Sequence, residues 1–319
     1  MARPRGSRAS SSFSGSPCCS STPNSGKTAR GGAEMTASSI AVHKLRRFGA
    51  GVAFYAIIIG FCAAVLFPVY WMIVNSIQPL SHGMQFPPPL IPKEISFLPF
   101  TTLFENFPVA RWLVNSLLLA GMTTLIVLAL AVLGSFAMTF LRWRGKAAFG
   151  LLLLMTQMLP EALVVIPVYA MYRNLGLSDS LPALSLVDAA FILPICIWIL
   201  KNSFDSIAEE IYEAALIDGC SPLGALVRTL LPLSAPGLVA ISVVSFFYAW
   251  NEYLFAVTLV TSPDIRPVAV GLASLKVMLD TPIDRVLAAA LFFSIFPVIF
   301  YLLIQRYIVA GLSAGAVKG

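Results

Sequence analysis

Three carboxylic acids lie within long apolar stretches of the chain: Glu161, Asp188 and Glu252. A charged side chain at the centre of a bilayer is costly, so such residues face a bundle interior, a partner subunit or a water-filled path. The third acid belongs to a run of aromatic, amide and acidic residues: Trp250, Asn251, Glu252 and Tyr253. Aromatic rings cover the C–H faces of sugars, while amides and carboxylates exchange hydrogen bonds with hydroxyl groups. We therefore treat all these residues as candidates for lining a translocation pathway for a hydroxyl-rich solute.

The same residues also have structural interpretations. Glu161 directly follows Pro160, where a helix kink is expected, and Asp188 lies near the outer end of its apolar stretch. Hydrogen bonds between neighbouring helices are an alternative role for both acids. For residues 250–253, packing against a second membrane subunit is the alternative to contact with a solute.

The sequence shows no constellation of residues suited to catalysis. It lacks a GxxxxGK[ST] phosphate-binding loop, and His43 and His82 have no partners at spacings suited to a metal or a nucleophile. The five cysteines have no zinc-site or disulfide-framework spacing: Cys18, Cys19, Cys62, Cys196 and Cys220. We expect no cofactor on this chain and no enzymatic activity.

The composition places these residues in a membrane protein. Hydrophobic residues make up 58% of the chain and charged residues 11%, against about 25% charged residues in soluble domains. A membrane-spanning helix needs about 20 mostly apolar residues. Six stretches qualify: residues 48–77, 112–141, 147–172, 182–200, 233–261 and 286–304. They are too long for the strands of a membrane barrel, so the predicted fold is an all-α membrane protein with six transmembrane helices.

The N-terminal segment differs from the rest of the chain. Residues 1–39 are rich in Ser, Gly, Ala and Pro, and they lack the apolar side chains needed to form a core. We therefore expect a disordered extension over residues 1–39 and a single transmembrane domain over residues 40–319. Met35 is an alternative start of translation, which would remove most of the extension.

The lysines and arginines indicate the orientation in the membrane. Fifteen of the 21 lie before the first predicted span or after the second, fourth or sixth, and six lie in the opposite loops. Cytoplasmic loops of membrane proteins are enriched in these residues, so both termini should be cytoplasmic. The net charge of +6 is then a signal of topology. No basic face with interleaved aromatic residues indicates nucleic-acid binding.

A polar-to-amphipathic insert of 27 residues separates the fourth and fifth predicted spans, beginning at Ser206 and ending at Pro232. Ser206 and Glu209 have the spacing of a capping box that starts a helix. Gly219 suits the left-handed end of that helix, Ser221 suits the N-cap of a second helix, and Pro232 suits its end. We predict two short helices on the cytoplasmic side, available to a partner. An ordinary surface hairpin is the alternative.

The insert resembles the EAA loop of the permease subunits of bacterial ABC importers. The resemblance rests on Glu213, Ala214, Ala215, Asp218, Gly219 and Pro232. Members of that family usually have an aliphatic residue three positions before the proline, where this chain has Thr229. The resemblance implies that the insert is a coupling helix pair that docks on a cytoplasmic ATPase subunit. It implies that Glu213 is a charged anchor, that the two alanines permit close approach and that Gly219 sets the bend.

The C-terminal residues 305–319, QRYIVAGLSAGAVKG, resemble the ending of the second (G-type) permease subunit of maltose-type carbohydrate importers. The resemblance extends over about residues 50–319. It implies a permease subunit of an ATP-driven importer that moves a sugar or sugar-like solute across the bacterial cytoplasmic (inner) membrane. The implied partners are a homologous sister permease, two ATPase subunits, an extracytoplasmic solute-binding protein and the sugar itself.

Two other functions remain open at this point. A permease of the same superfamily could import another solute, such as a glycerol phosphate ester, although no cluster of Lys or Arg within the spans is suited to hold a phosphate. A non-transport membrane scaffold, whose cytoplasmic hairpin binds a regulatory partner, is the alternative from a different class.

Overall fold

The computed structural model describes residues 29–78, 90–92, 94–277 and 282–315 of the chain. It divides into two compact units, residues 1–66 and residues 67–319. In the described residues, all regular secondary structure is helical. The all-α class predicted from the composition is therefore confirmed.

Helix α1 (Ala29–Ser76) begins in the first unit and contains Pro68. Its part from Gly51 to Ser76 is long and apolar enough to cross a membrane. Of the disorder predicted over residues 1–39, residues 1–28 lie outside the described residues. Residues 29–39 belong to helix α1, in a stretch where Ala, Met and Glu favour a helix.

Three further helices are long and apolar enough to cross a membrane. They are α4 (Val109–Thr139), α7 (Leu181–Asp205) and the part of α14 (Ile283–Gly315) up to Arg306. Two bent helix pairs also qualify, so the described residues hold four spans, or up to six if each pair is counted as one span.

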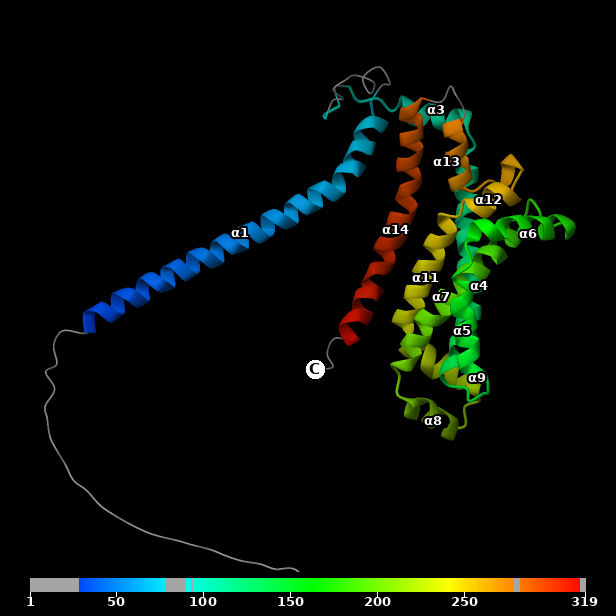
Figure 1. The fold of residues 1–319 in the computed structure, drawn as a ribbon. Coiled ribbons are helices and arrows are strands. Elements are labelled where there is room, and N and C mark those ends of the chain that lie inside the picture. Colours follow the sequence, from blue (N-terminus) through cyan, green and yellow to red (C-terminus); the bar gives the residue numbers. More distant parts are fainter. Residues whose placement is uncertain (1–28, 79–89, 93, 278–281, 316–319) are drawn as a thin grey trace, which may run out of the picture. The chain divides into compact units, whose positions relative to one another are not determined.

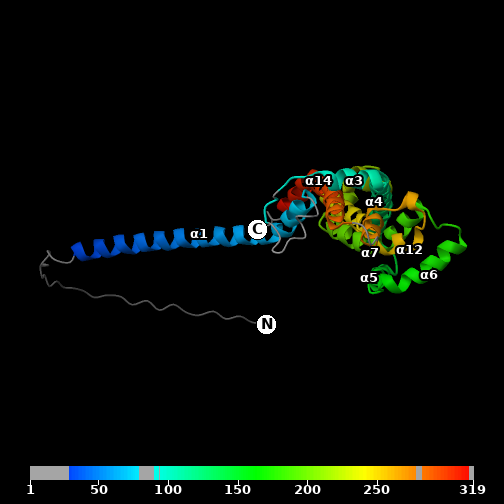
Figure 2. The same cartoon turned by 90° about the horizontal axis from the view of Figure 1, so that it is seen from above.

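The first bent pair replaces the continuous span predicted over residues 147–172. Helices α5 (Lys146–Thr156) and α6 (Glu161–Asn174) meet at 96° across a break of four residues. Pro160, in extended conformation before α6, is the physical reason, because proline lacks an N–H and restricts the residue before it. Seen from above, α6 extends away from α4 and α7 (Figure 2).

The span predicted over residues 233–261 is also not one continuous helix. Helix α11 (Ala235–Trp250) ends in this stretch, and a separate short helix, α12 (Leu254–Leu259), follows it. The second bent pair lies at the other end of α11, where residues Pro222–Leu233 meet α11 at 83°. Two short segments, residues 251–253 and Ser234, therefore lie between helices.

The core of the second unit is built from three helices. Helices α4 and α7 make the most extensive pair, and α11 packs on both of them. Gly237 of α11 allows this close packing, because a Cβ there would come within 2.6 Å of Ser203 on α7. Helix α14 packs on α11 and on α3 (Leu98–Asn106).

The two ends of this bundle carry different elements (Figure 1). Helix α8 (Glu209–Ile217) lies at one end. Helices α3, α12 and α13 (Val268–Val277) lie toward the other, where a short 3-10 helix, η2 (Pro263–Ile265), joins α12 to α13. The two groups of candidate residues predicted from the sequence follow this division.

Candidate functional site: a helical hairpin and a broken span

The insert forms a helical hairpin whose turn is built around Gly219. The amide of Gly219 donates to the carbonyl of Leu216 at 3.1 Å, and the amide of Cys220 donates to the carbonyl of Ala215 at 3.0 Å. This pair of bonds is a Schellman motif. It requires the left-handed backbone that Gly219 adopts at φ +87°. The predicted bend at Asp218 and Gly219 is therefore present.

The second arm of the hairpin begins with a side-chain cap. Ser221 accepts a hydrogen bond from the amide of Gly224 at 3.1 Å, and Pro222 occupies the first turn of α9 (Pro222–Ala225). The cap satisfies a backbone donor that the helix itself leaves free. This start of the second helix is as the sequence predicted.

The predicted capping box at the start of the first arm is wrong. Ser206 ends α7 and donates to the carbonyl of Ser203 at 2.7 Å, while the N-cap of α8 is Ala208, which makes no side-chain cap bond. Helix α7 continues five residues past the predicted end at residue 200. Glu209 pairs instead with Arg142, whose Nη2 lies 3.1 Å from its Oε1.

The second arm ends at Leu233, one residue after Pro232, where the sequence predicted its end. The arm continues from α9 through a π-helix, η1 (Leu226–Leu230), and through α10 (Leu231–Leu233), which contains Pro232. The amide of Leu231 donates to the carbonyl of Leu226. This wider turn lies directly before the proline, whose ring a regular helix would not accommodate without a kink.

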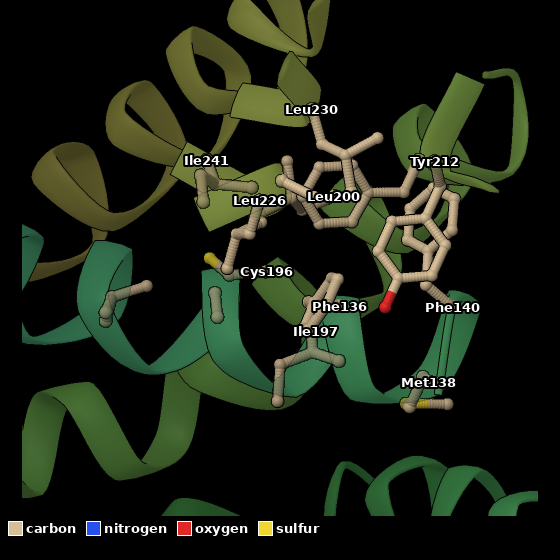
Figure 3. Close-up of a cluster of buried hydrophobic side chains, with 14 of the residues drawn as sticks. Phe136, Met138, Phe140, Cys196, Ile197, Leu200, Tyr212, Leu226, Leu230 and Ile241 are labelled. Carbon is tan, nitrogen blue, oxygen red and sulfur yellow. The ribbon is translucent and has the colours of Figure 1, made fainter. Parts of the chain in front are cut away.

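One face of the hairpin packs into the bundle. The ring of Tyr212 lies 5.9 Å from that of Phe136 and 5.0 Å from that of Phe140, centroid to centroid. Figure 3 shows these three rings beside Leu226 and Leu230 of the second arm. We call this group the hairpin cluster; with Phe204 and Leu200 of α7 it belongs to one continuous buried core. The hairpin is therefore fixed to the C-terminal ends of α4 and α7. These are the ends that the sequence predicts to be cytoplasmic.

The residues of the predicted docking motif do not all face outward. Glu213, Ala214 and Asp218 are exposed, whereas Ala215 is buried in the chain's own core. Ala215 therefore permits close packing within this chain. Glu213 lies 3.9 Å from Arg142, and the two acids Glu209 and Glu213 raise the pKa of that guanidinium. Because all three side chains are exposed, the pairs add little to stability.

The hairpin exposes large apolar side chains beside its charged ones. On its two arms these are Ile211, Leu216, Ile217, Leu223, Val227 and Leu233. Ile217 is the most exposed of them, at 86%. Contiguous exposed apolar side chains of this kind mark surfaces that bind a partner.

At the other end of the bundle, the second group of candidates lies where α11 stops and α12 begins. We call α11, α12 and residues 251–253 between them the broken span. Glu252 lies in the break, is almost fully buried, and accepts a hydrogen bond from the amide of Phe255 at 2.7 Å. It therefore caps α12. Trp250 is buried with its ring stacked on those of Phe246 and Phe296, and Asn251 is exposed and donates to the carbonyl of Phe247 at 2.7 Å.

Two cavities flank α13 beside this break. The first has a volume of about 510 Å³ and is lined by residues of α11, α13 and α14, with Trp250, Asn251 and Tyr253 in its wall. The second has a volume of about 610 Å³ and is lined by residues of α12, α13 and the segment between them. Tyr253 lines both. Three of the four residues predicted at positions 250–253 thus share a cavity, and Glu252 does not line it.

The other two acids lie outside the walls of these cavities. Tyr248 donates a hydrogen bond of 2.7 Å to Glu161, which joins α11 to the start of α6. Asp188 is fully buried in α7, and neither of its carboxyl oxygens has a hydrogen-bond partner in the described part of the chain. Glu161 therefore makes the helix–helix bond that the sequence left as an alternative. The structure does not unite the six candidates in one site.

Polar contacts fix the segment between α12 and α13. Asp179, itself at φ +56°, accepts hydrogen bonds of 2.7 Å from the amide and hydroxyl of Thr261 and of 2.8 Å from the amide of Ser262. These bonds lower the pKa of Asp179. Arg111 forms an ion pair with Asp264. These contacts were not predicted from the sequence, because the residues that make them lie more than 80 positions apart along the chain.

The sequence comparisons identify the family. Residues 130–313 match the family described as "Binding-protein-dependent transport system inner membrane component". The chain is 32% identical to the inner membrane ABC transporter permease protein YcjP of Escherichia coli, over 84% of this chain and 96% of that protein. It is 34% identical to the trehalose transport system permease protein SugB of Mycobacterium tuberculosis, over 80% of this chain and 93% of that protein.

A solved structure shares the fold. A chain from a bacterial ABC transporter involved in the import of the acidic polysaccharide alginate superposes with a TM-score of 0.72 at 24% identity, covering 82% of this chain and 96% of that one. The family match and the two relatives confirm the resemblance to ABC importer permeases that residues 213–232 indicated. The spanning helices and the family description identify a multi-pass protein of the inner membrane. The chain belongs to the binding-protein-dependent transport system inner membrane components, the permeases of ABC transporters.

Proposed function

We propose that the chain is one permease subunit of an ATP-driven importer that moves a sugar or sugar-like solute across the cytoplasmic membrane. The observation that carries the proposal is the break between α11 and α12 inside an apolar stretch, with aromatic and amide side chains in the wall of the adjoining cavity. Irregular backbone at membrane depth is tolerated only inside protein or beside a water-filled path. The trehalose permease among the relatives supports a saccharide as the solute.

The broken span supplies the contacts that such a solute needs. Trp250 and Tyr253 offer rings to the C–H faces of a sugar, and Asn251 offers an amide to its hydroxyl groups. In transporters generally, discontinuous helices form solute sites near the middle of the bilayer. Glu252 contributes by fixing the start of α12, and Glu161 by holding α6 against α11.

In this proposal α5 and α6 together form one span, and α11 with α12 forms another, which with the four long helices gives six. The hairpin of α8 and α9–α10 then lies between the fourth and fifth spans as the coupling helix pair. Its exposed apolar side chains dock on an ATPase subunit, and Glu213 provides a charged anchor beside them. The distribution of the lysines and arginines supports a cytoplasmic position for this hairpin and both termini.

The partners follow from the same arrangement. A homologous sister permease completes the pathway, two ATPase subunits bind below, and an extracytoplasmic binding protein delivers the solute. ATP and Mg²⁺ bind to the ATPase subunits, and this chain holds no cofactor.

The hairpin cluster provides the mechanical link. When ATP closes the ATPase subunits, they move the hairpin, and Tyr212 transfers the movement to α4 through Phe136 and Phe140. Packed side chains move as rigid bodies, because a close-packed core resists deformation. Helices α4, α7 and α11 then tilt together and turn the cavity from one side of the membrane to the other.

The test is uptake of labelled saccharides, polyols and glycerol phosphates by a strain lacking the gene and by the complemented strain. Restored uptake of a saccharide supports the proposal. Restored uptake of a glycerol phosphate alone would replace the sugar with that solute.

A further inference from the structure

Arg266 places a positive charge in a cavity wall beside the broken span. It lines the second cavity, together with Tyr253, Thr261 and Ser274. Among the described residues that line this cavity or the first, Arg266 is the charged one. A cation in a wall that is otherwise apolar and hydroxyl-bearing indicates a ligand with an anionic group.

The guanidinium of Arg266 is incompletely satisfied within the described residues. One terminal nitrogen donates to the carbonyl of Thr261 at 3.3 Å. The Nε atom is buried and has no acceptor in that part of the chain. A guanidinium has five N–H donors, and the single bond to Thr261 leaves most of those of Arg266 without an acceptor in the described part of the chain.

The acids of this region are engaged elsewhere. Asp264 forms an ion pair with Arg111, and Asp179 accepts three hydrogen bonds from Thr261 and Ser262. None of the described carboxylates lies within ion-pair distance of Arg266. The positive charge therefore remains available to a ligand in the cavity.

The two cavities suit a ligand of more than one ring. They lie on opposite flanks of α13, with Ala269 and Leu272 facing the first and Val270 and Ala273 facing the second. Tyr253 belongs to both walls. Their volumes of about 510 and 610 Å³ lie within the usual range of small-molecule sites, about 300–1,000 Å³.

We propose that the two cavities form one composite site for an acidic saccharide, with its carboxylate or sulfonate group bound by Arg266 and a sugar ring held at Tyr253. The planar guanidinium can donate two parallel hydrogen bonds to such a group. Hydroxyl groups of the remaining sugar meet Asn251 and Ser294 in the first cavity. This inference rests on the proposed function and narrows its solute class.

The test compares matched pairs of labelled saccharides in cells that express the full transporter. Each pair has a neutral member and its acidic counterpart, such as lactose with lactobionate and glucose with glucuronate. The variants are Arg266→Gln and Arg266→Lys, with Arg173→Gln as the control that removes another basic charge. Because the solute-binding protein is the same in every strain, differences between variants report on this chain.

We expect Arg266→Gln to raise the half-saturating concentration for the acidic member at least about tenfold, as for loss of a charge-assisted hydrogen bond, and Arg266→Lys to raise it less. Uptake of a neutral member by Arg266→Gln, with a normal amount of protein in the membrane, verifies folding. Uptake of neutral members only, or equal losses for both members, would overturn the inference and leave the proposed function intact. Failure to take up any saccharide would overturn both.

Discussion

Arg142, in the turn after α4, lies 3.1 Å from Glu209 at the start of α8, so residues 67 positions apart join the hairpin to the membrane helices. The rings of Phe140 and Tyr212 lie 5.0 Å apart, centroid to centroid. Because the exposed ion pair adds little to stability, the buried aromatic contact is what fixes this arm of the hairpin. Movement of that arm must be shared by α4.

Gly219→Leu tests the bend of the hairpin. At φ +87° a side chain destabilises the backbone by about 1–2 kcal/mol. No atom lies within 4 Å of a Cβ placed there, so the effect is conformational. We expect the variant to reach the membrane and its ATPase partner to remain active, while solute uptake falls at least tenfold.

Gly219→Asn is the matched control, because asparagine tolerates the left-handed conformation. It should retain most of the uptake. Wild-type uptake by Gly219→Leu would show that the bend has no part in coupling.

Tyr212→Ala tests the hairpin cluster. Removing a buried aromatic ring costs about 3–5 kcal/mol, and here the loss falls between the hairpin and α4. We expect a lower Tm of the purified transporter and a loss of uptake that exceeds the loss of folded protein. Tyr212→Phe keeps the ring contacts with Phe136 and Phe140 and should behave like the wild type. Equal behaviour of the two variants would contradict a mechanical role for the ring.

The sequence predicted the hairpin turn because Gly219 and Ser221 act locally. A left-handed glycine and a serine N-cap need only their immediate neighbours. Ser206 failed for the opposite reason. Phe204 is fully buried in the core, and its packing extends α7 as far as Asp205, which leaves Ser206 at the end of one helix rather than at the start of the next.

The broken span was harder to predict. Hydropathy treats residues 233–261 as continuous because almost every side chain there is apolar. The break depends on Glu252, whose side chain caps α12. Arg266 and Tyr248 were not among the predicted site residues. Tyr248 bonds to Glu161, which is 87 positions away along the chain, and Arg266 lies in a cavity wall. Hydrophobic periodicity carries no information on either relationship.

Tyr248→Phe tests the bond between α11 and α6. The hydroxyl of Tyr248 donates to Glu161 at 2.7 Å. Hydrogen bonds between membrane helices contribute about 1 kcal/mol. We expect Tyr248→Phe and Glu161→Leu each to lower Tm slightly, and the double variant to lose less stability than the sum of the two. Full additivity in this double-mutant cycle would show that the bond contributes nothing.

Asp179 predicts a pH dependence at the outer loops. The amides of Ser262 and Thr261 and the Thr261 hydroxyl favour the ionised carboxylate and lower its pKa. The stabilisation is therefore present above the pKa of Asp179 in the unfolded chain, and it is lost as the pH falls through the lower pKa of the folded chain. Thermal unfolding between pH 6 and pH 3 should show this loss in the wild type.

Asp179→Asn supplies the comparison for that experiment. Asparagine tolerates the φ of +56° but does not ionise. Its Tm should be lower at pH 6 and should depend less on pH. An unchanged pH profile would contradict the role of the Asp179 carboxylate as the acceptor that holds Thr261 and Ser262.

Uptake with Glu213→Ala tests the central claim most directly. A strain lacking the gene receives either the wild-type chain or the variant, and labelled saccharides, polyols and glycerol phosphates are offered in turn. We predict that the wild type restores uptake of a saccharide and that Glu213→Ala, present in the membrane in equal amount, does not. Glu210→Ala, which changes another exposed acid of the same helix, should retain uptake. Full uptake with Glu213→Ala would contradict coupling through the hairpin, and the absence of any saccharide uptake by the wild type would contradict the proposed function.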